Sequence, residues 1–311
     1  MDLSVILSNS AVYSFMCSRY YKSSVKLYLR LSDFEEYGKP INFDEHNAQF
    51  NRFSLIHHIY LESLILSFLC MNVLKNERQC ERENLEYNLH EVCGLAMYTW
   101  LPFDIDYFPA KQIYLSFQFF GIHHLFAVMG IAAWSAMETV YHVIIRIRHA
   151  KHLFLEAINE ENYQRQREKF NLAVRYHESV LRLEDLLNET FGVFMFTHLA
   201  MTAPILGTGL FGLLHAGSIS SLLLAIGWFF GVTVGCLSGQ RLENESLSVA
   251  TTIYNSPWYN CSKDLRRDIF VVLMRCRRPM YLKAASFGIM NHVMLLGILK
   301  GSYSYITLLA Q

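Results

Sequence analysis

The chain has 311 residues, of which 52% are hydrophobic, 14% aromatic and only 17% charged. Hydrophobic content this high excludes a disordered chain, and 27 basic residues balanced by 27 acidic ones leave no positive excess for binding nucleic acid. Seven cysteines in a chain of this length exclude a small disulfide-stapled scaffold. A charged fraction below the value of about a quarter in soluble domains leaves a very apolar soluble protein or a membrane protein with polar loops.

Six stretches of the chain are nearly free of charged residues, and each is expected to form a membrane-spanning helix. A span needs about 20 apolar residues. No Asp, Glu, Lys or Arg occurs between Thr190 and Gln240, which is long enough for two spans with a turn at His215–Ser218. The N-terminal stretch, residues 3–18, lacks the basic start of a signal peptide and is interpreted as a marginal span. In chain order the stretches are 3–18, 53–74 (interrupted by Glu62), 113–137, 192–214, 219–237 and 284–308.

The chain is therefore predicted to be an all-α, polytopic helical membrane protein with six visible spans. Its orientation follows from the basic residues, which concentrate on the cytoplasmic side of inserted proteins. The segments 19–52, 141–189 and 241–283 hold six, eight and eight of the 27 Lys and Arg residues, so we expect them to be cytoplasmic and the C-terminus to be external. The N-terminus is then external too, and we expect an earlier span and a cytoplasmic leader upstream of Met1.

The cytoplasmic segments are expected to contain helices of their own. Glu156–Leu187 has apolar residues along one side and predicts a long polar helix. A second helix is predicted over Asp264–Arg275, whose acidic start and basic end suit the helix dipole. Pro279 then interrupts the helix, so the last membrane helix is expected in two parts, one cytoplasmic and one spanning. The basic run Arg275–Lys283 is either the inner flank of that span or a site for anionic lipid.

Groups capable of chemistry are few inside the spans. The adjacent pairs His57-His58 and His123-His124 lack the i, i+4 spacing of a helical metal site, and are interpreted as polar groups facing the bundle interior or a cavity. Glu62 is costly within a membrane and is expected to face protein or water. No hydrolase, metalloprotease, phosphate-loop or dinucleotide motif occurs, so neither an enzyme nor a cofactor is predicted.

The outer side of the bundle leaves two questions open. Cys80 and Cys93 lie in the expected external loop and either form a disulfide or remain free thiols. Phenylalanine, tyrosine and methionine are frequent in the spans, which suits a cavity for a small hydrophobic ligand but also suits ordinary packing. Examples are Phe117, Phe119, Phe120, Phe126 and Met201.

The last third of the chain carries a family resemblance. Tyr254 is followed four residues later by Trp258, and a basic segment ends in Arg278-Pro279. The other elements are Gly239-Gln240, Ser302-Tyr303-Ser304-Tyr305 and Thr307-Leu308-Leu309, with Leu101-Pro102-Phe103-Asp104, Tyr114, Gln118, His177 and Leu181 upstream. On these elements the chain resembles the insect odorant receptor family from roughly Phe53 to the end.

The resemblance implies a seven-helix receptor with a cytoplasmic N-terminus and an external C-terminus, whose second to seventh helices correspond to the six spans. The family's co-receptor has a long insertion between its fourth and fifth helices, for which the segment 141–189 is too short, so an odour-tuned subunit is implied. Further implications are an odorant-gated, non-selective cation channel, assembled with the co-receptor as a hetero-tetramer in the plasma membrane of olfactory sensory neurons. The expected partners are this co-receptor, a small hydrophobic odorant and membrane lipid.

The resemblance also assigns regions and residues. Residues 1–237 would form the ligand-binding bundle with cytoplasmic helical extensions, and residues 238–311 a cytoplasmic anchor and a pore-lining last helix. By depth in the bundle, the expected ligand contacts are Tyr13, Phe68, Met71, Phe117, Phe120, His124 and Met201. The expected pore residues are Ser304, Thr307, Leu308 and Gln311, which share one helix face by their spacing.

In that arrangement an apolar ring at Leu308 would gate the pore by dewetting. The alternative function is a chemoreceptor of the G-protein-coupled type, which has the opposite orientation and an internal C-terminus.

Overall fold

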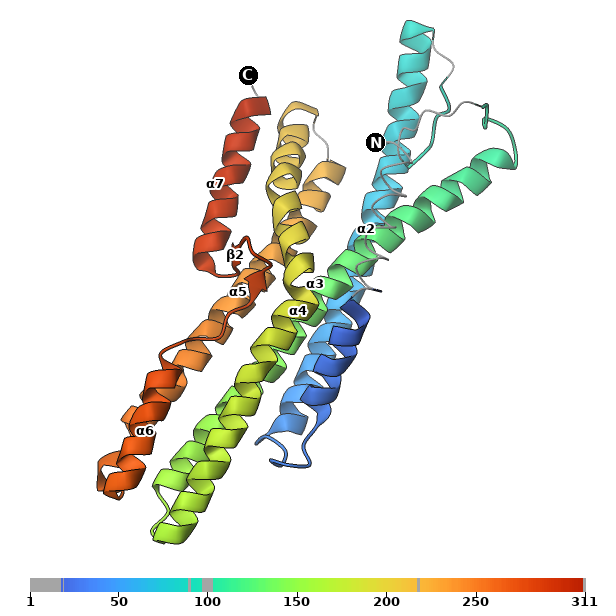
Figure 1. Cartoon of the computed structure of the whole chain (residues 1–311). Coiled ribbons are helices and arrows are strands. Elements are labelled where there is room, and N and C mark those ends of the chain that lie inside the picture. The colour runs from blue at the N-terminus through green and yellow to red at the C-terminus, as the bar shows by residue number, and fades with distance from the viewer. Residues whose placement is uncertain (1–17, 19, 89–90, 97–102, 217–218, 310–311) are drawn as a thin grey trace.

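The computed structural model describes residue 18 and residues 20–88, 91–96, 103–216 and 219–309. Long helices make up almost all of this part of the chain and diverge toward the end that holds the C-terminus (Figure 1). The all-α prediction is confirmed. The elements are a helix over residues 20–32, α2 (Phe43–Tyr87), α3 (Ala110–Ile158), α4 (Tyr163–Ala216), α5 (Ile219–Tyr254), the 3-10 turn η1 (Trp258–Asn260), α6 (Lys263–Cys276), β1 (Lys283–Ala284), β2 (Gly288–Ile289) and α7 (His292–Leu309).

Four helices of the described chain, α2, α3, α4 and α5, are long and apolar enough to cross a membrane. They contain the stretches predicted to span at 53–74, 113–137, 192–214 and 219–237. The longest, α4, has 54 residues, which is about 80 Å at 1.5 Å per residue and far exceeds the ~30 Å hydrocarbon layer. Each of these helices can therefore cross a bilayer and still project well beyond it. The predicted first span, 3–18, lies outside the described residues except for its last one.

The predicted polar helix over Glu156–Leu187 is wrong at its start. Residue 156 belongs to the end of α3, and residues 159–162 form a turn before α4 begins. Asn162 fixes the new start, because its side-chain Oδ1 accepts a hydrogen bond from the backbone N–H of Arg165 at 3.2 Å. From Tyr163 the helix then runs without a break through the predicted polar segment and into the predicted span.

The C-terminal helical region comes in two parts, as predicted, but α7 is not among the helices of the described chain that are long and apolar enough to cross a membrane. The first part is α6, where Ser262 accepts from the backbone N–H of Leu265 as the N-cap. The expected start of the second part near residue 284 is wrong, because β1 and β2 pair antiparallel there. The helix α7 begins only after Asn291, whose side chain accepts from the N–H of Met294 at 3.0 Å.

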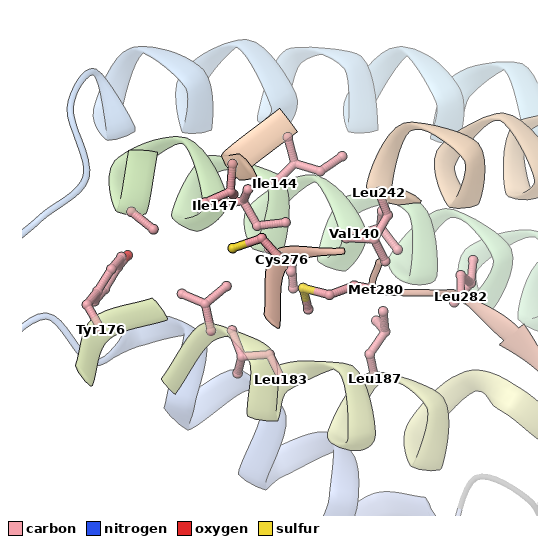
Figure 2. Close-up of a cluster of buried hydrophobic side chains, with 14 of the residues drawn as sticks. Val140, Ile144, Ile147, Tyr176, Leu183, Leu187, Leu242, Cys276, Met280 and Leu282 are labelled. Atoms are coloured by element: carbon pink, nitrogen blue, oxygen red, sulfur yellow. The ribbon is translucent and has the colours of Figure 1, made fainter. Parts of the chain in front are cut away.

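The largest buried core lies where α3, α4, α5 and α6 run together, and Figure 2 shows part of it. It contains 35 buried residues, and we call it the base cluster. Its labelled members in Figure 2 are Val140, Ile144, Ile147, Tyr176, Leu183, Leu187, Leu242, Cys276, Met280 and Leu282.

The linker between α6 and β1 is threaded through the base cluster and has its backbone groups paired by side chains. Ser246 accepts from the N–H of Met280 at 2.9 Å, and Glu184 accepts from the N–H of Tyr281 at 3.1 Å. Asn188 donates to the carbonyl of Tyr281 and accepts from the N–H of Lys283. Because unpaired buried backbone groups are costly, these side chains fix the path of the chain between the two parts of the last helix.

Candidate functional site

An apolar pocket lies between α2, α3 and α5, with one residue contributed by α4. Its volume of about 80 Å³ is several times the ~10–15 Å³ that one water molecule needs on the same measure. The pocket therefore has room for several waters, and because it is smaller than the ~150 Å³ cavity that holds benzene, an organic ligand has to widen it. It is lined by His57, Tyr60, Leu61, Leu64, Ile65, Phe68, Phe126, Gly130, Ala133, Trp134, His198, Leu224, Gly227, Trp228, Phe230, Gly231 and Val234.

Glycines set the distance between the helices around this pocket. A Cβ on Gly130 of α3 would lie 2.5 Å from Cδ2 of Leu61, so the glycine lets that leucine enter between the helices. On α5 a Cβ at Gly231 would lie 3.0 Å from Nε2 of His198. The missing side chains therefore leave room for leucine and histidine at the pocket wall.

Two histidine rings are stacked on two indole rings at the wall. His57 of α2 lies on Trp134 of α3, with ring centroids 4.1 Å apart and planes 9° from parallel. His198 of α4 lies on Trp228 of α5, at 5.0 Å and 12°. Each stack joins two consecutive helices, α2 to α3 and α4 to α5, so the aromatic wall is held by contacts between helices.

The indole N–H groups are already paired with residues that do not line the pocket. Trp134 donates to the Ser54 hydroxyl at 2.7 Å, and Trp228 donates to the Thr202 hydroxyl at 2.9 Å. Thr202 in turn donates to the carbonyl of His198 at 2.6 Å. The pocket thus presents the faces of the indoles, while their polar edges are used to fix their orientation.

The residues predicted as ligand contacts are only partly brought together. Phe68 lines the pocket and meets Phe126 edge-on at 5.6 Å. Met71 is partly buried but does not line the pocket. The side chains of the other described candidates are exposed and do not line the pocket, and Tyr13 is outside the described residues; the exposed ones are Phe117, Phe120, His124 and Met201.

The reason for this difference is the angle about the helix axis. Depth along a span predicts how far a residue lies from the membrane surface, but a residue one position away faces about 100° to the side. Phe120 is 74% exposed for this reason, and it stacks on the exposed His124 instead of pointing inward.

The two histidine pairs were interpreted as polar groups facing the interior, and this holds for one member of each pair. His57 and His123 face the interior, while His58 and His124 are exposed. Nε2 of His123 lies 2.7 Å from a carboxylate oxygen of Glu62, so α2 and α3 are joined by this pair. The partner of the intramembrane carboxylate is therefore a protein side chain, which meets the expectation that such a group faces protein or water.

The predicted pore residues lie on one exposed face of α7. Ser304, Thr307 and Leu308 are exposed, and Leu308 is 65% so, while Gln311 lies outside the described residues. The opposite face of α7 packs on α4, where Tyr305 lies so close to Gly207 that a Cβ there would clash with it. The face carrying the predicted pore residues is therefore free to line a passage or meet another subunit.

The loop after α2 is closed by a disulfide between Cys80 and Cys93, which decides the question that the sequence left open. Cys80 is buried, and the loop is held further by Asn84, whose amide donates to the carbonyl of Glu91 at 2.9 Å. The Ala96 N–H donates to the side chain of Gln118 on α3. The disulfide loop is thus tied to both helices that it connects.

The fold and the pocket define a multi-pass helical membrane receptor. Residues 5–303 match the family described as 7tm Odorant receptor, and the chain belongs to this family. Its members are receptors and not enzymes, which confirms that prediction. The resemblance found in the motifs of the last third is thereby confirmed as well.

The fold matches that of a solved insect receptor. The structure of the olfactory receptor OR5 from Machilis hrabei in complex with eugenol aligns with a TM-score of 0.78, at 14% identity, over 99% of this chain and 80% of that one. At this identity the match concerns the fold alone.

Relatives by sequence include odour receptors and co-receptors. The putative odorant receptor 85d of Drosophila melanogaster is 23% identical over 69% of this chain and 53% of its own length. The odorant receptor coreceptor of Aedes aegypti is 28% identical over 44% of this chain and 30% of its own length. The chain therefore spans about half or less of the length of the curated relatives it matches.

Proposed function

We propose that this chain is the odour-tuned subunit of an odorant-gated, non-selective cation channel that assembles with a co-receptor subunit in a tetramer. The observation that carries the proposal is the apolar pocket with its stacked aromatic rings, set between three helices that are long and apolar enough to cross a membrane. A pocket of this composition suits a small hydrophobic molecule. A rearrangement of the pocket walls would then be passed along α4 and α5, against which α7 packs, to the exposed face of α7.

The proposed ligand contacts are those of the pocket wall. Phe68 remains from the set expected on the basis of depth, and the stacked aromatic rings join it. The Machilis hrabei receptor OR5 was solved with eugenol, a small aromatic molecule, bound to it. This supports an aromatic ligand for the pocket of the present chain.

The odour-tuned role is supported by the connection between α3 and α4. Only the four residues 159–162 separate these helices, so there is no room for the long insertion expected of a co-receptor. The presence of co-receptors among the relatives supports assembly with such a subunit. We assign residues 1–237 to the ligand-binding bundle and residues 238–311 to the anchor and the pore helix.

The proposed location is the plasma membrane of olfactory sensory neurons, with α6 and the 159–162 turn in the cytoplasm and the end of α7 outside. The basic residues of the segments 141–189 and 241–283 support this orientation. Labelling of a C-terminal epitope on intact cells tests it. External labelling agrees with the channel, whereas labelling only after permeabilisation would favour the G-protein-coupled alternative.

The central experiment expresses the chain together with an odorant co-receptor and records currents evoked by a broad panel of odorants. We expect odour-evoked cation current that the co-receptor alone does not give. Leu308→Ser is expected to raise the current without odour, because it makes the proposed gate easier to wet. Ile306→Val, on the packed side of the same helix, is the matched control. Surface expression without current for any odorant would contradict the proposal.

A further inference from the structure

The apolar pocket contains buried nitrogen atoms that have no partner in the described part of the chain. His198 is 5% exposed, and neither Nδ1 nor Nε2 of its ring has a hydrogen-bond partner there. Nε2 of His57 is buried without a partner as well. The unused hydrogen-bonding capacity of the buried pocket wall therefore belongs mainly to two histidines, since the indole N–H groups are already paired and Tyr60 is 40% exposed.

Packing alone does not explain why these histidine nitrogens are buried without hydrogen-bond partners. A neutral imidazole has one N–H donor and one acceptor nitrogen, and leaving either unpaired in a buried site is costly. Phenylalanine would stack on Trp228 equally well without that cost. A ligand that supplies the missing hydrogen bond explains why a histidine occupies this position, whereas packing alone does not.

One edge of the His198 ring packs against a glycine of α5. A Cβ on Gly231 would lie 3.0 Å from Nε2 and 3.2 Å from Cε1 of His198, so this edge faces α5 at a position without a side chain. Both residues line the pocket. Nε2 is buried where it faces Gly231, so a ligand atom reaches it by a small outward movement of α5.

We propose that His198, assisted by His57, makes this pocket select neutral aromatic or alicyclic odorants that carry a hydroxyl group. The proposal rests on the proposed function of the pocket as the odorant site. A hydroxyl both donates and accepts, so it pairs with either tautomer of the ring. A hydrocarbon leaves the nitrogens unpaired and is rejected, and a carboxylate is disfavoured because its charge would be buried in an apolar cavity.

The test compares 2-phenylethanol with propylbenzene, in which a methyl group replaces the hydroxyl. Cells express the full chain with a co-receptor, and the half-maximal concentration for current is measured for both compounds. The same pair is titrated against the purified chain by quenching of tryptophan fluorescence, since Trp134 and Trp228 form part of the wall. We expect the alcohol to be about tenfold more potent, the factor that one good hydrogen bond gives.

His198→Phe keeps the stack on Trp228 but removes both nitrogens, and it is expected to lower the alcohol-to-hydrocarbon preference from about tenfold to about one. Ile65→Val, an apolar change in the same wall, is the matched control and should shift both compounds together. If His198→Phe does not reach the surface, Gly231→Ala takes its place, because the added methyl covers Nε2 and should also reduce the preference.

The outcomes separate this inference from the proposed channel. Equal potency of the two compounds in the unaltered chain, or an undiminished preference in the variants, overturns the selection by His198 and leaves the channel function standing. Alcohol-selective quenching without any current supports the selection and contradicts the channel. Neither quenching nor current with either compound overturns both.

Discussion

The base cluster and the pocket region are built from the same long helices but in opposite ways. The base cluster buries 35 hydrophobic residues, and a linker with paired backbone groups runs through it. Around the pocket the neighbouring cluster buries six, and large apolar side chains such as Leu55, Ile59 and Leu66 point outward. The outward face suits lipid, and the loosely filled interior suits a ligand.

Because of this difference, the two regions of the same helices can have different roles. A core filled at the density of a protein interior resists change, so the base cluster can hold α6 and the linker in one position. The pocket has unfilled volume and unpaired nitrogens, so its state can respond to what enters it. A receptor needs both parts, because a ligand can only shift an equilibrium between states that the rest of the molecule keeps distinct.

The largest expected effect comes from removing a ring from the base cluster. Phe154 is fully buried, with its ring centroid 5.8 Å from that of Phe170. Phe154→Ala should lower the free energy of unfolding by about 3–5 kcal/mol. Phe120→Ala, at a position 74% exposed, should have little effect in detergent. Thermal unfolding of both variants is followed by size-exclusion chromatography, and equal losses would contradict the contrast between the two regions.

The next effect is a dependence on pH that the base cluster imposes through His177. Burial, with a smaller contribution from the charge of Arg275, lowers the pKa of His177 to about 4. In the unfolded chain the ring titrates near ~6.5. Above that pH the ring is neutral in both the folded and the unfolded chain, so it does not change the free energy of unfolding. As the pH falls from there to about 4 the unfolded chain binds a proton that the folded chain does not, so stability falls by about 3 kcal/mol.

The measurement is the slope of stability against pH over this window, for the chain and for His177→Gln. The variant should lose the part of the slope that His177 contributes. Glu184 acts in the opposite direction, because burial raises its pKa, and its contribution cancels in the comparison. His152→Gln, at an exposed position, is the control. Identical slopes for the His177 variant and the unaltered chain would show that this ring does not titrate differently on folding.

Much of the fold could be predicted from the sequence, because charges are excluded from the hydrocarbon layer and their absence marks the spans directly. The two errors in helix boundaries both fall where an asparagine starts a helix. Asn162 begins α4 and Asn291 begins α7. Capping depends on the local path of the chain, which hydropathy does not report.

The pocket was far less predictable, because it depends on which rings meet across helices. His198 is the single histidine of the uncharged span 192–214, and its partner Trp228 lies on the next helix. The interpretation of the histidine pairs as interior groups was right for only one member of each pair, since His58 and His124 are exposed. A usable signal was the spacing of Gly227 and Gly231, which lie four residues apart and so share one face of α5 at the pocket.

The smallest expected effect tests whether glycines keep the pocket region open. In Gly130→Ala the new methyl would lie 2.5 Å from the end of the Leu61 side chain. Leu61 can move because it is flexible, so the loss of stability should be about 1 kcal/mol, at the low end for overpacking. The displaced leucine should narrow the pocket and weaken odour responses.

The control is Gly297→Ala on α7, where the added methyl meets nothing within 4 Å. This change should be neutral or slightly stabilising, because alanine is the better helix former. Thermal unfolding and odour potency are measured for both variants. Unchanged potency in Gly130→Ala would mean that the space beside Leu61 is not used by the ligand.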